Sequence, residues 1–315
     1  MKILITGANG FVGRALCKVL FDAGLSVRGA VRKRENASSF HDDLISIGDI
    51  GRDTKWEEAL QGIDTVVHLA ARVHVMKDAS LDSLGEYRRV NAEGTYRLAR
   101  KAAESGVRRL VYVSTIKVNG EQTNNIPFTE SDEPNPQDAY AISKLEAEQS
   151  LREIAQKTGL EVVVLRPPLV YGPGVSANFF KLLELIDAGI PLPLGRVRNS
   201  RSLIYIGNLV DAIVRCVQHP SAANKVFLVS DGEDLSTPEL IRRLASALNK
   251  PAHLVPFPSS LLRLAGAITG RSDEIKRLAD SLRIDNSKIR TELNWTPPFT
   301  VDEGLKHTAE WFLRR

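Results

Sequence analysis

Short apolar runs alternate with longer amphipathic stretches over the first two thirds of the chain. The apolar runs are nearly continuous in valine, isoleucine and leucine, which is typical of parallel strands buried on both faces. We expect these strands at residues 2–6, 26–31, 44–47, 65–68, 109–113 and 161–165. The stretches between them predict helices at residues 12–23, 54–60, 84–105 and 140–157. The alternation predicts an α/β fold with a Rossmann-type, doubly wound parallel sheet.

The pattern changes after the sixth expected strand. Proline and glycine are frequent over residues 166–202, and two further apolar runs, at residues 203–206 and 226–229, are expected to return to the sheet. The rest of the chain has mostly helical patterns. We expect two parts. Residues 1–170 plus 203–235 form the domain of the parallel sheet, and residues 171–202 plus 236–315 form a smaller, mostly helical C-terminal lobe.

A glycine-rich loop follows the first expected strand. Gly7, Gly10 and Gly13 form a G-x-x-G-x-x-G pattern between that strand and the first helix. Glycine permits a tight turn and lets the backbone approach a pyrophosphate closely. The helix N-terminus presents unpaired N–H groups and a positive dipole end to the phosphates. A bare turn could also explain the glycines, but their place between a strand and a helix predicts a dinucleotide site.

Tyr140 and Lys144 are the candidate catalytic pair. Their spacing of four residues places both side chains on one face of a helix. A free tyrosine titrates at about 10, and a neighbouring ammonium together with an oxidised nicotinamide would lower that pKa. Tyrosine could then exchange a proton with a substrate hydroxyl or ketone while hydride moves. A tyrosine and a lysine at this spacing also occur as simple surface decoration, so the pair gains its meaning from the glycine loop.

The ordered motifs of the chain resemble the extended branch of the short-chain dehydrogenase/reductase superfamily, whose members modify nucleotide sugars. The resemblance covers essentially the whole chain and rests on Thr6 with the glycine loop, Gly48-Asp49-Ile50, His68-Leu69-Ala70-Ala71, Asn91 with Gly94-Thr95, Tyr140 with Lys144, and residues 166–174. It implies cofactor contacts from Gly7, Gly10, Phe11, Val12, Gly13, Arg32, Asp49, Ile50, Leu69, Ala70, Ala71, Tyr140, Lys144 and Pro167.

The resemblance also implies a third catalytic residue and a substrate site. Thr115, at the end of the fifth strand, matches the superfamily's catalytic hydroxyl, with Ser114 as the neighbouring alternative. The residues expected at the substrate are Thr115, Lys117, Asn178, Arg201 and Arg277, of which Arg201 matches the arginine that binds the diphosphate. The expected partner is a UDP-linked or other nucleotide-linked hexose. Helices 84–105 and 140–157 correspond to those that form a homodimer in relatives.

The end of the second strand bears on the choice of dinucleotide. NAD-selective relatives carry an acidic residue about where Val31 stands, whereas here Arg32, Lys33 and Arg34 follow. A guanidinium can bind a 2′-phosphate bidentately, which a carboxylate would repel. A solvated basic turn is the simpler explanation of these charges. We favour NADPH with Arg32 as its main contact, and NAD is the alternative cofactor.

Two departures from related enzymes narrow the reaction. Thr115-Ile116-Lys117 replaces the Thr-Asp-Glu of nucleotide-sugar 4,6-dehydratases, so the acid and base for water elimination are missing. Leu169 stands where related 4-epimerases often have asparagine. We therefore expect a reductase of a UDP-4-keto-6-deoxyhexose or its amine, and residues 114–120 and 166–174 are similar to bacterial 4-reductases of this kind that serve polysaccharide biosynthesis. A UDP-hexose 4-epimerase that retains NAD and an inactive NADPH-binding scaffold are the alternatives.

Composition excludes other classes of protein. The 315 residues carry a net charge of +4, without an arginine-rich run that would indicate a nucleic-acid partner. The six histidines lack paired spacing, which argues against a metal site. The two cysteines, Cys17 and Cys216, are expected to be buried free thiols of a reducing compartment. No apolar run is long enough for a bilayer, so a cytoplasmic protein is expected.

The cofactor preference can be tested directly. NADPH is expected to bind more tightly than NADH, because Arg32 can hold a 2′-phosphate. Titration of the protein with each dinucleotide gives the two dissociation constants, and tighter binding of NADH would overturn the assignment.

Overall fold

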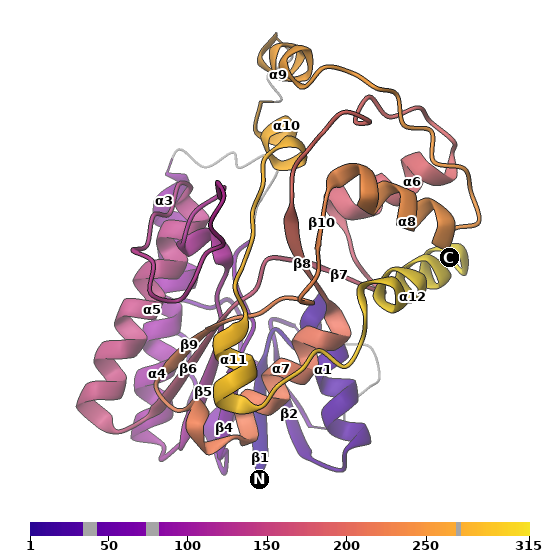
Figure 1. The fold of residues 1–315 in the computed structure, drawn as a ribbon. Helices are drawn as coiled ribbons and strands as arrows, with labels where there is room; N and C mark the ends of the chain where they lie inside the picture. The colour runs from indigo at the N-terminus through magenta and orange to yellow at the C-terminus, as the bar shows by residue number, and fades with distance from the viewer. Residues whose placement is uncertain (34–42, 74–81, 269–271) are drawn as a thin grey trace.

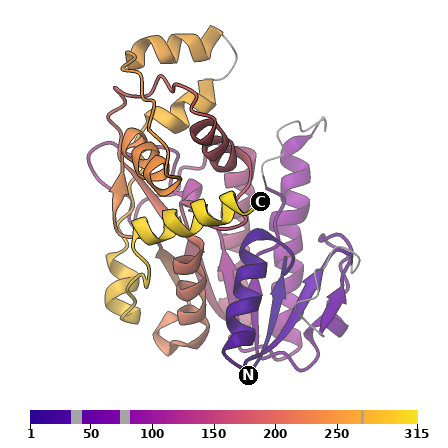
Figure 2. The same cartoon turned by 90° about the vertical axis from the view of Figure 1, so that its right-hand side faces the viewer.

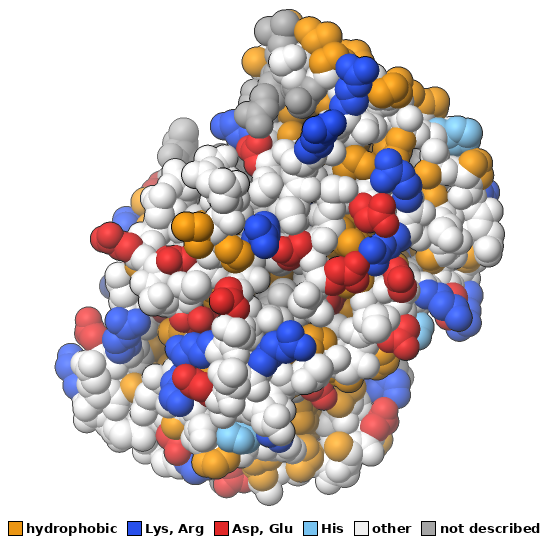
Figure 3. All heavy atoms as spheres, viewed as in Figure 1, with side chains coloured by type: hydrophobic (Ala, Val, Ile, Leu, Met, Phe, Trp, Pro, Cys, Tyr) orange, Lys and Arg blue, Asp and Glu red, His pale blue; other side chains and the backbone are white. Residues whose placement is uncertain are grey.

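The computed structural model describes residues 1–33, 43–73, 82–268 and 272–315. A large parallel sheet lies between two layers of helices, and a smaller lobe of strands and helices extends from one end of it (Figures 1 and 2). Acidic and basic side chains are interspersed over the face seen in Figure 3. No helix within the described ranges is long and apolar enough to cross a membrane.

The large sheet confirms the expected doubly wound topology. Its seven strands follow the order β3-β2-β1-β4-β5-β6-β9, and every pair of neighbours is parallel. Their bounds are β1 Lys2–Thr6, β2 Ser26–Val31, β3 Leu44–Ser46, β4 Thr65–His68, β5 Arg109–Val113, β6 Glu161–Arg166 and β9 Lys225–Leu228. The chain winds outward in one direction from β1 and in the other from β4. The carboxyl ends of these two neighbours therefore form the crevice where open α/β sheets bind ligands.

Alternate residues of each strand supply two separate cores. Ile3 and Ile5 of β1 pack in the core on the side of α1 (Phe11–Asp22) and α7 (Ile206–Gln218). Leu4, between them, packs in the core on the side of α4 (Gly94–Glu104) and α5 (Ala139–Thr158). This follows from the two-residue repeat of a strand and explains the continuous apolar runs. Cys17 and Cys216 are buried free thiols in α1 and α7, as expected.

The expected helices form with small differences at their ends. Residues 84–105 are one helical stretch of three parts, α3 (Ser83–Tyr87), a π-helical turn (Arg88–Glu93) and α4. The other short elements of this domain are α2 (Glu57–Leu60), η3 (Ile116–Val118), η4 (Pro220–Ala222) and α11 (Ser287–Leu293).

A second sheet corrects one expectation. Residues 203–206 were expected in the large sheet, but β8 (Arg201–Tyr205) pairs with β7 (Leu169–Tyr171) and β10 (Asp234–Leu235) in a separate sheet of three strands. Pro167 and Pro168 have no N–H to continue a ladder, so the chain leaves the large sheet after β6. The expectation for 226–229 is confirmed, because β9 pairs with β6.

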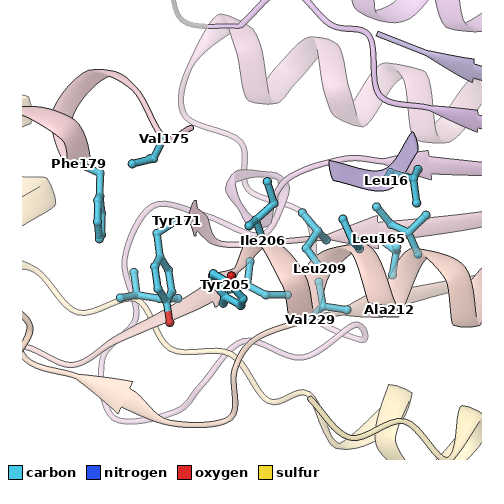
Figure 4. Packing of buried hydrophobic residues seen from close by; sticks show 14 of the residues in the cluster. Leu16, Leu165, Tyr171, Val175, Phe179, Tyr205, Ile206, Leu209, Ala212 and Val229 are labelled. Atoms are coloured by element: carbon cyan, nitrogen blue, oxygen red, sulfur yellow. The ribbon is translucent and has the colours of Figure 1, made fainter. Parts of the chain in front are cut away.

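The lobe is joined to the sheet by a shared core. Its helices are α6 (Ala177–Asp187), α8 (Thr237–Ala247), α9 (Ser259–Ile268), α10 (Ser272–Ala279) and α12 (Val301–Leu313). The apolar cluster in Figure 4 runs from Leu16 and Leu165 of the large domain to Tyr171 and Phe179 of the lobe. This continuity fixes the position of the lobe above the carboxyl ends of the strands.

Arg109 at the start of β5 is a buried structural charge. Its Nε pairs with Glu161 at 2.7 Å, and its Nη1 donates to the carbonyls of Cys216, Val217 and His219 at the end of α7. Arg109→Met is expected to cost about 2–4 kcal/mol of the free energy of unfolding, because it leaves the carbonyls of Cys216 and Val217 without the guanidinium donor. Glu161 keeps its bond from Arg108, and His219 O keeps its bond from Ala222 N. Urea denaturation measures this loss, and a change below about 1 kcal/mol would contradict it.

Candidate active site

The glycine loop leaves no room for side chains. Gly7 has φ +69°, and its carbonyl accepts from Gly10 N at 2.9 Å. A Cβ on Gly13 would lie 2.1 Å from Gly7 O, and one on Gly7 would lie 3.0 Å from Ala70 N. The loop therefore closes on the start of α1 and against the segment after β4. This bare backbone at the β1–β4 crevice fits the pyrophosphate of a dinucleotide.

A buried histidine holds the two loops together. Thr6 Oγ1 lies 3.2 Å from both Leu69 N and Ala70 N and 2.6 Å from His68 Nδ1. The Thr6 hydroxyl accepts hydrogen bonds from these two N–H groups, so its own O–H donates a hydrogen bond to His68 Nδ1. His68 is therefore the Nε2–H tautomer, which donates to Thr95 Oγ1 at 2.9 Å. Burial lowers the pKa of His68 to about 3, and the positive charge of Lys144 adds to this effect.

Tyr140 and Lys144 lie in the first turns of α5. The helix starts at Asp138, whose carboxylate accepts from Ala141 N at 2.7 Å. Lys144 Nζ donates to Val113 O at 2.7 Å and lies 4.2 Å from the centre of the Tyr112 ring. Burial lowers the pKa of Lys144 to about 7, which the carboxylate of Glu148 opposes.

The pKa of Tyr140 is raised in the structure, whereas a lowered pKa is expected in a complex with the oxidised nicotinamide. Burial raises it, and the negative charge of Asp138 adds to the increase. In the chain alone the loss of hydration is the largest cause of this increase. A lowered pKa therefore requires the positive nicotinamide as well.

Asn91 positions the start of α5 from the π-helical turn. Its Nδ2 donates to Ser143 Oγ at 3.0 Å, and this hydroxyl donates to Tyr140 O at 2.7 Å. The side-chain amide of Asn91 also binds both the N–H and the carbonyl of Arg72. The ring of Tyr87 packs edge-on against Tyr140 at 6.2 Å. Sequence reasoning missed Ser143 and Tyr87, although Ser143 stands three residues after Tyr140.

The structure separates Thr115 from its neighbour Ser114. Ser114 is buried and its hydroxyl donates to Glu148 at 2.5 Å. Thr115 is half-buried just before η3, and within the described residues its hydroxyl accepts a weak 3.3 Å bond from Lys117 N. The next residue, Ile116, binds Pro167 O at 2.9 Å. Thr115 is thus the hydroxyl that remains available at the ends of β5 and β6.

Other expected contacts are spread around the crevice. Lys117 Nζ pairs with Asp138 at 2.6 Å and Glu121 at 2.8 Å, so two carboxylates hold this ammonium near the start of α5. Arg32 and Asp49 form an exposed ion pair at 2.9 Å beside the end of β2, which sets a carboxylate next to the expected 2′-phosphate contact. Arg34 lies outside the described residues.

The expected substrate residues lie in the lobe and around its sheet. Arg201 starts β8 and its Nη1 donates to Asp280 O at 2.9 Å. Burial lowers the pKa of Arg201, and the positive charge of Arg277 on α10 adds to this. The negative charge of Asp280 opposes these two effects. Asn178 lies exposed on α6.

A buried ion pair lies between α5 and the large sheet. Glu148 accepts from Arg166 through two bonds, of 2.5 Å and 3.0 Å, and Arg166 Nη1 donates to Asn119 Oδ1 at 2.9 Å. All three side chains are at most 4% exposed. Sequence reasoning missed this cluster. Its signal was Glu148, which follows Lys144 by four residues and so lies on the same face of the helix.

These observations define a class of protein: a dinucleotide-binding oxidoreductase fold with a tyrosine–lysine site. A model of the NAD dependent epimerase/dehydratase family matches residues 3–230. The chain belongs to this family and is an enzyme of it. In the described residues, no group of three or more His, Cys, Asp or Glu side chains is arranged to hold a metal ion.

Individual relatives match along almost the whole chain. The chain is 48% identical over 318 residues to a UDP-glucose 4-epimerase of Vibrio cholerae, covering 99% of this chain and 96% of that protein. A solved UDP-glucose 4-epimerase of Thermotoga maritima with UDP-glucose is 25% identical, with a TM-score of 0.78 over 100% of this chain and 99% of the other. The UDP-glucuronic acid 4-epimerase of Bacillus cereus with NAD shares the fold, with a TM-score of 0.81, 24% identity and coverage of 100% and 99%.

The buried histidine predicts a dependence of stability on pH. Unfolded His68 binds a proton below about pH 6.5, whereas the folded residue stays neutral down to about pH 3. The free energy of unfolding therefore decreases as the pH is lowered through this window. His68 accounts for about 2 kcal/mol of that decrease between pH 7 and pH 5.

His68→Gln is expected to remove this part of the pH dependence. Urea denaturation at the two pH values measures it, with His253→Gln, at an exposed histidine, as the control. An unchanged difference between pH 7 and pH 5 in His68→Gln would refute the assignment.

Proposed function

We propose that the chain exchanges hydride at C4 of a UDP-linked hexose, with Tyr140 as the acid or base at O4. The observation that carries this proposal is the bond from Lys144 Nζ on α5 to Val113 O, two residues before Thr115. Tyr140 lies one turn before Lys144 on the same helix, and the glycine loop follows β1 in the same sheet. The similarity to UDP-glucose 4-epimerases of Vibrio cholerae and Thermotoga maritima supports the UDP-hexose and the C4 position.

Each catalytic residue has a distinct task in this proposal. A bound nicotinamide supplies or accepts the hydride at C4. Tyr140 donates the phenolic proton to O4 as the C4 ketone is reduced, and it regains a proton before the next turnover. Thr115 donates a hydrogen bond to the same oxygen and fixes its orientation. Lys144 carries a positive charge beside this oxygen, and Arg201 with Arg277 binds the diphosphate.

We infer that the net reaction is reduction of a UDP-linked 4-ketohexose, with NADPH consumed in each turnover. Support comes from the end of β2, where Val31 is followed by the exposed cations Arg32 and Lys33. One hydride reaches C4, one proton reaches O4, and the oxidised dinucleotide leaves. The pairing of Arg32 with Asp49 weakens the expected preference for NADPH, because a 2′-phosphate has to compete with that carboxylate for Arg32.

The second candidate is 4-epimerisation of a UDP-hexose with retained NAD. It is favoured by the 48% identity to the UDP-glucose 4-epimerase of Vibrio cholerae. The same residues then act twice, because Tyr140 removes the O4 proton and later returns it. Both candidates use one chemistry at C4 and differ in whether reducing equivalents are consumed. The homodimer expected from the sequence stays a prediction, with α4 and α5 as its interface.

The role of Tyr140 is tested by replacement. Tyr140→Phe is expected to reduce kcat at least about 100-fold, because the proton donor at O4 is lost. Tyr96→Phe, at an exposed tyrosine, is the matched control and should retain wild-type kcat. Equal turnover in Tyr140→Phe and wild type would end the enzymatic assignment of this residue.

The two net reactions are separated by their products. Incubation with a UDP-linked 4-ketohexose and NADPH is expected to oxidise one NADPH for each ketone reduced, followed at 340 nm and by chromatography of the sugar nucleotides. Interconversion of UDP-glucose and UDP-galactose without added reductant would establish the epimerase instead.

A further inference from the structure

Three ionisable residues follow one another along one face of α5 at intervals of four. Tyr140 and Lys144 form the proposed catalytic pair, and Glu148 stands one turn further on. A lysine and a glutamate at this spacing are neighbours on a helix and commonly form an ion pair. Both are buried here, which would strengthen that attraction. A Lys144–Glu148 pair is therefore the arrangement that the local sequence favours.

The structure has a different arrangement. Lys144 Nζ donates to the carbonyl of Val113 and lies over the Tyr112 ring. The Glu148 carboxylate instead receives two bonds from the guanidinium of Arg166 and one from Ser114. Arg166 is thus the counter-ion that Glu148 uses. It reaches Glu148 from β6, a strand that is adjacent to β5 in the sheet.

We propose that Arg166 is a positioning residue that holds the Glu148 carboxylate and so keeps the Lys144 ammonium free to act at Tyr140 and the cofactor. If Arg166 were absent, Glu148 would be a buried charge without a cationic partner, one turn from a buried ammonium. Formation of a Lys144–Glu148 pair would then draw the ammonium along the helix, away from Val113 O. The benefit for turnover rests on the proposed function, whereas the competition for Glu148 does not.

The remaining groups near Lys144 make this competition specific to Glu148. Tyr112 faces Lys144 from β5, and His68 feels its charge from β4. Burial raises the pKa of Tyr112 and lowers that of His68, so both are neutral near pH 7. Tyr140 on the same helix is also neutral, because burial raises its pKa. Glu148 is the group among these that can carry a negative charge next to Lys144.

Arg166 also ties together the strand ends that carry the site. Through Asn119 it reaches the loop after η3, since Asn119 Nδ2 donates to Thr129 O at 2.9 Å. Through Glu148 it fixes Ser114, next to Thr115. A purely structural role for this network is therefore the competing explanation. The experiment has to separate stability from the state of Lys144.

The pKa of Lys144 provides a measurement that needs neither substrate nor turnover. The protein is labelled with ¹³C-lysine, and the Cε signal that disappears in Lys144→Gln is followed by NMR as a function of pH. In Arg166→Met the pKa of Lys144 is expected to rise by at least about 1, because an unpaired carboxylate stabilises the ammonium. Arg166→Lys retains a charge but loses the two-bond geometry, so a smaller increase is expected.

The double variant is the decisive control. Arg166→Met/Glu148→Gln removes both charges and is expected to return the pKa of Lys144 to the wild-type value or below it. Arg109→Met removes another buried arginine of the sheet, at the opposite ends of the strands, and should leave the Lys144 titration unchanged. The melting temperature of every variant is recorded alongside.

An unchanged Lys144 titration in both Arg166→Met and Arg166→Lys, with only a lower melting temperature as in Arg109→Met, would overturn the proposal. The same holds if the double variant keeps the raised value. Should the titrations behave as expected while no sugar nucleotide is turned over, the proposed function fails and the role of Arg166 at Glu148 stands. In an active enzyme, Arg166→Met should lower kcat more than it changes KM, and the double variant should recover part of that loss.

Discussion

The packing of α5 against the carboxyl ends of β5 and β6 is the constraint on which the site depends. The helix carries Tyr140 and Lys144, and β5 delivers Thr115 and the carbonyl of Val113. Lys144 and Glu148 are buried between the helix and the sheet and must satisfy their charges there. The carbonyl of Val113 and the guanidinium of Arg166 do so from two neighbouring strands. A shift of α5 along its axis would break both contacts together.

The dinucleotide side of the crevice is built on a different principle. Its loops carry little side-chain chemistry and rely on backbone approach, as at Gly13, where even a methyl group would overlap Gly7 O. Such loops need an internal brace. The neutral ring of His68 provides it by accepting a hydrogen bond from Thr6 and donating one to Thr95. One half of the site is therefore held by buried charges and the other half by a chain of neutral hydrogen bonds.

The same architecture serves a reductase and an epimerase equally well. Both need a proton at O4, a hydride position at C4 and a diphosphate anchor, for which we propose Tyr140, the bound nicotinamide and Arg201 with Arg277. The difference lies in how the dinucleotide is held between turnovers. The exposed Arg32–Asp49 pair stands where the two cofactors differ, and its two charges favour opposite answers. The two candidate reactions of the proposed function therefore share the chemistry at C4 and differ in the fate of the dinucleotide.

The sequence by itself determined the large domain and the local parts of the site. Period-two burial in parallel strands and the glycine loop are local patterns, and the four-residue spacing of Tyr140 and Lys144 fixes a shared helix face. Tertiary structure alone decided which sheet the run at 203–206 would join, because an apolar strand does not encode its neighbours. It also decided that Ser114 donates its hydrogen bond to Glu148, while the Thr115 hydroxyl makes no such bond. The Glu148 carboxylate pairs with Arg166 and not with Lys144 for the same reason. These outcomes depend on distances between segments far apart in the chain, which no local pattern specifies.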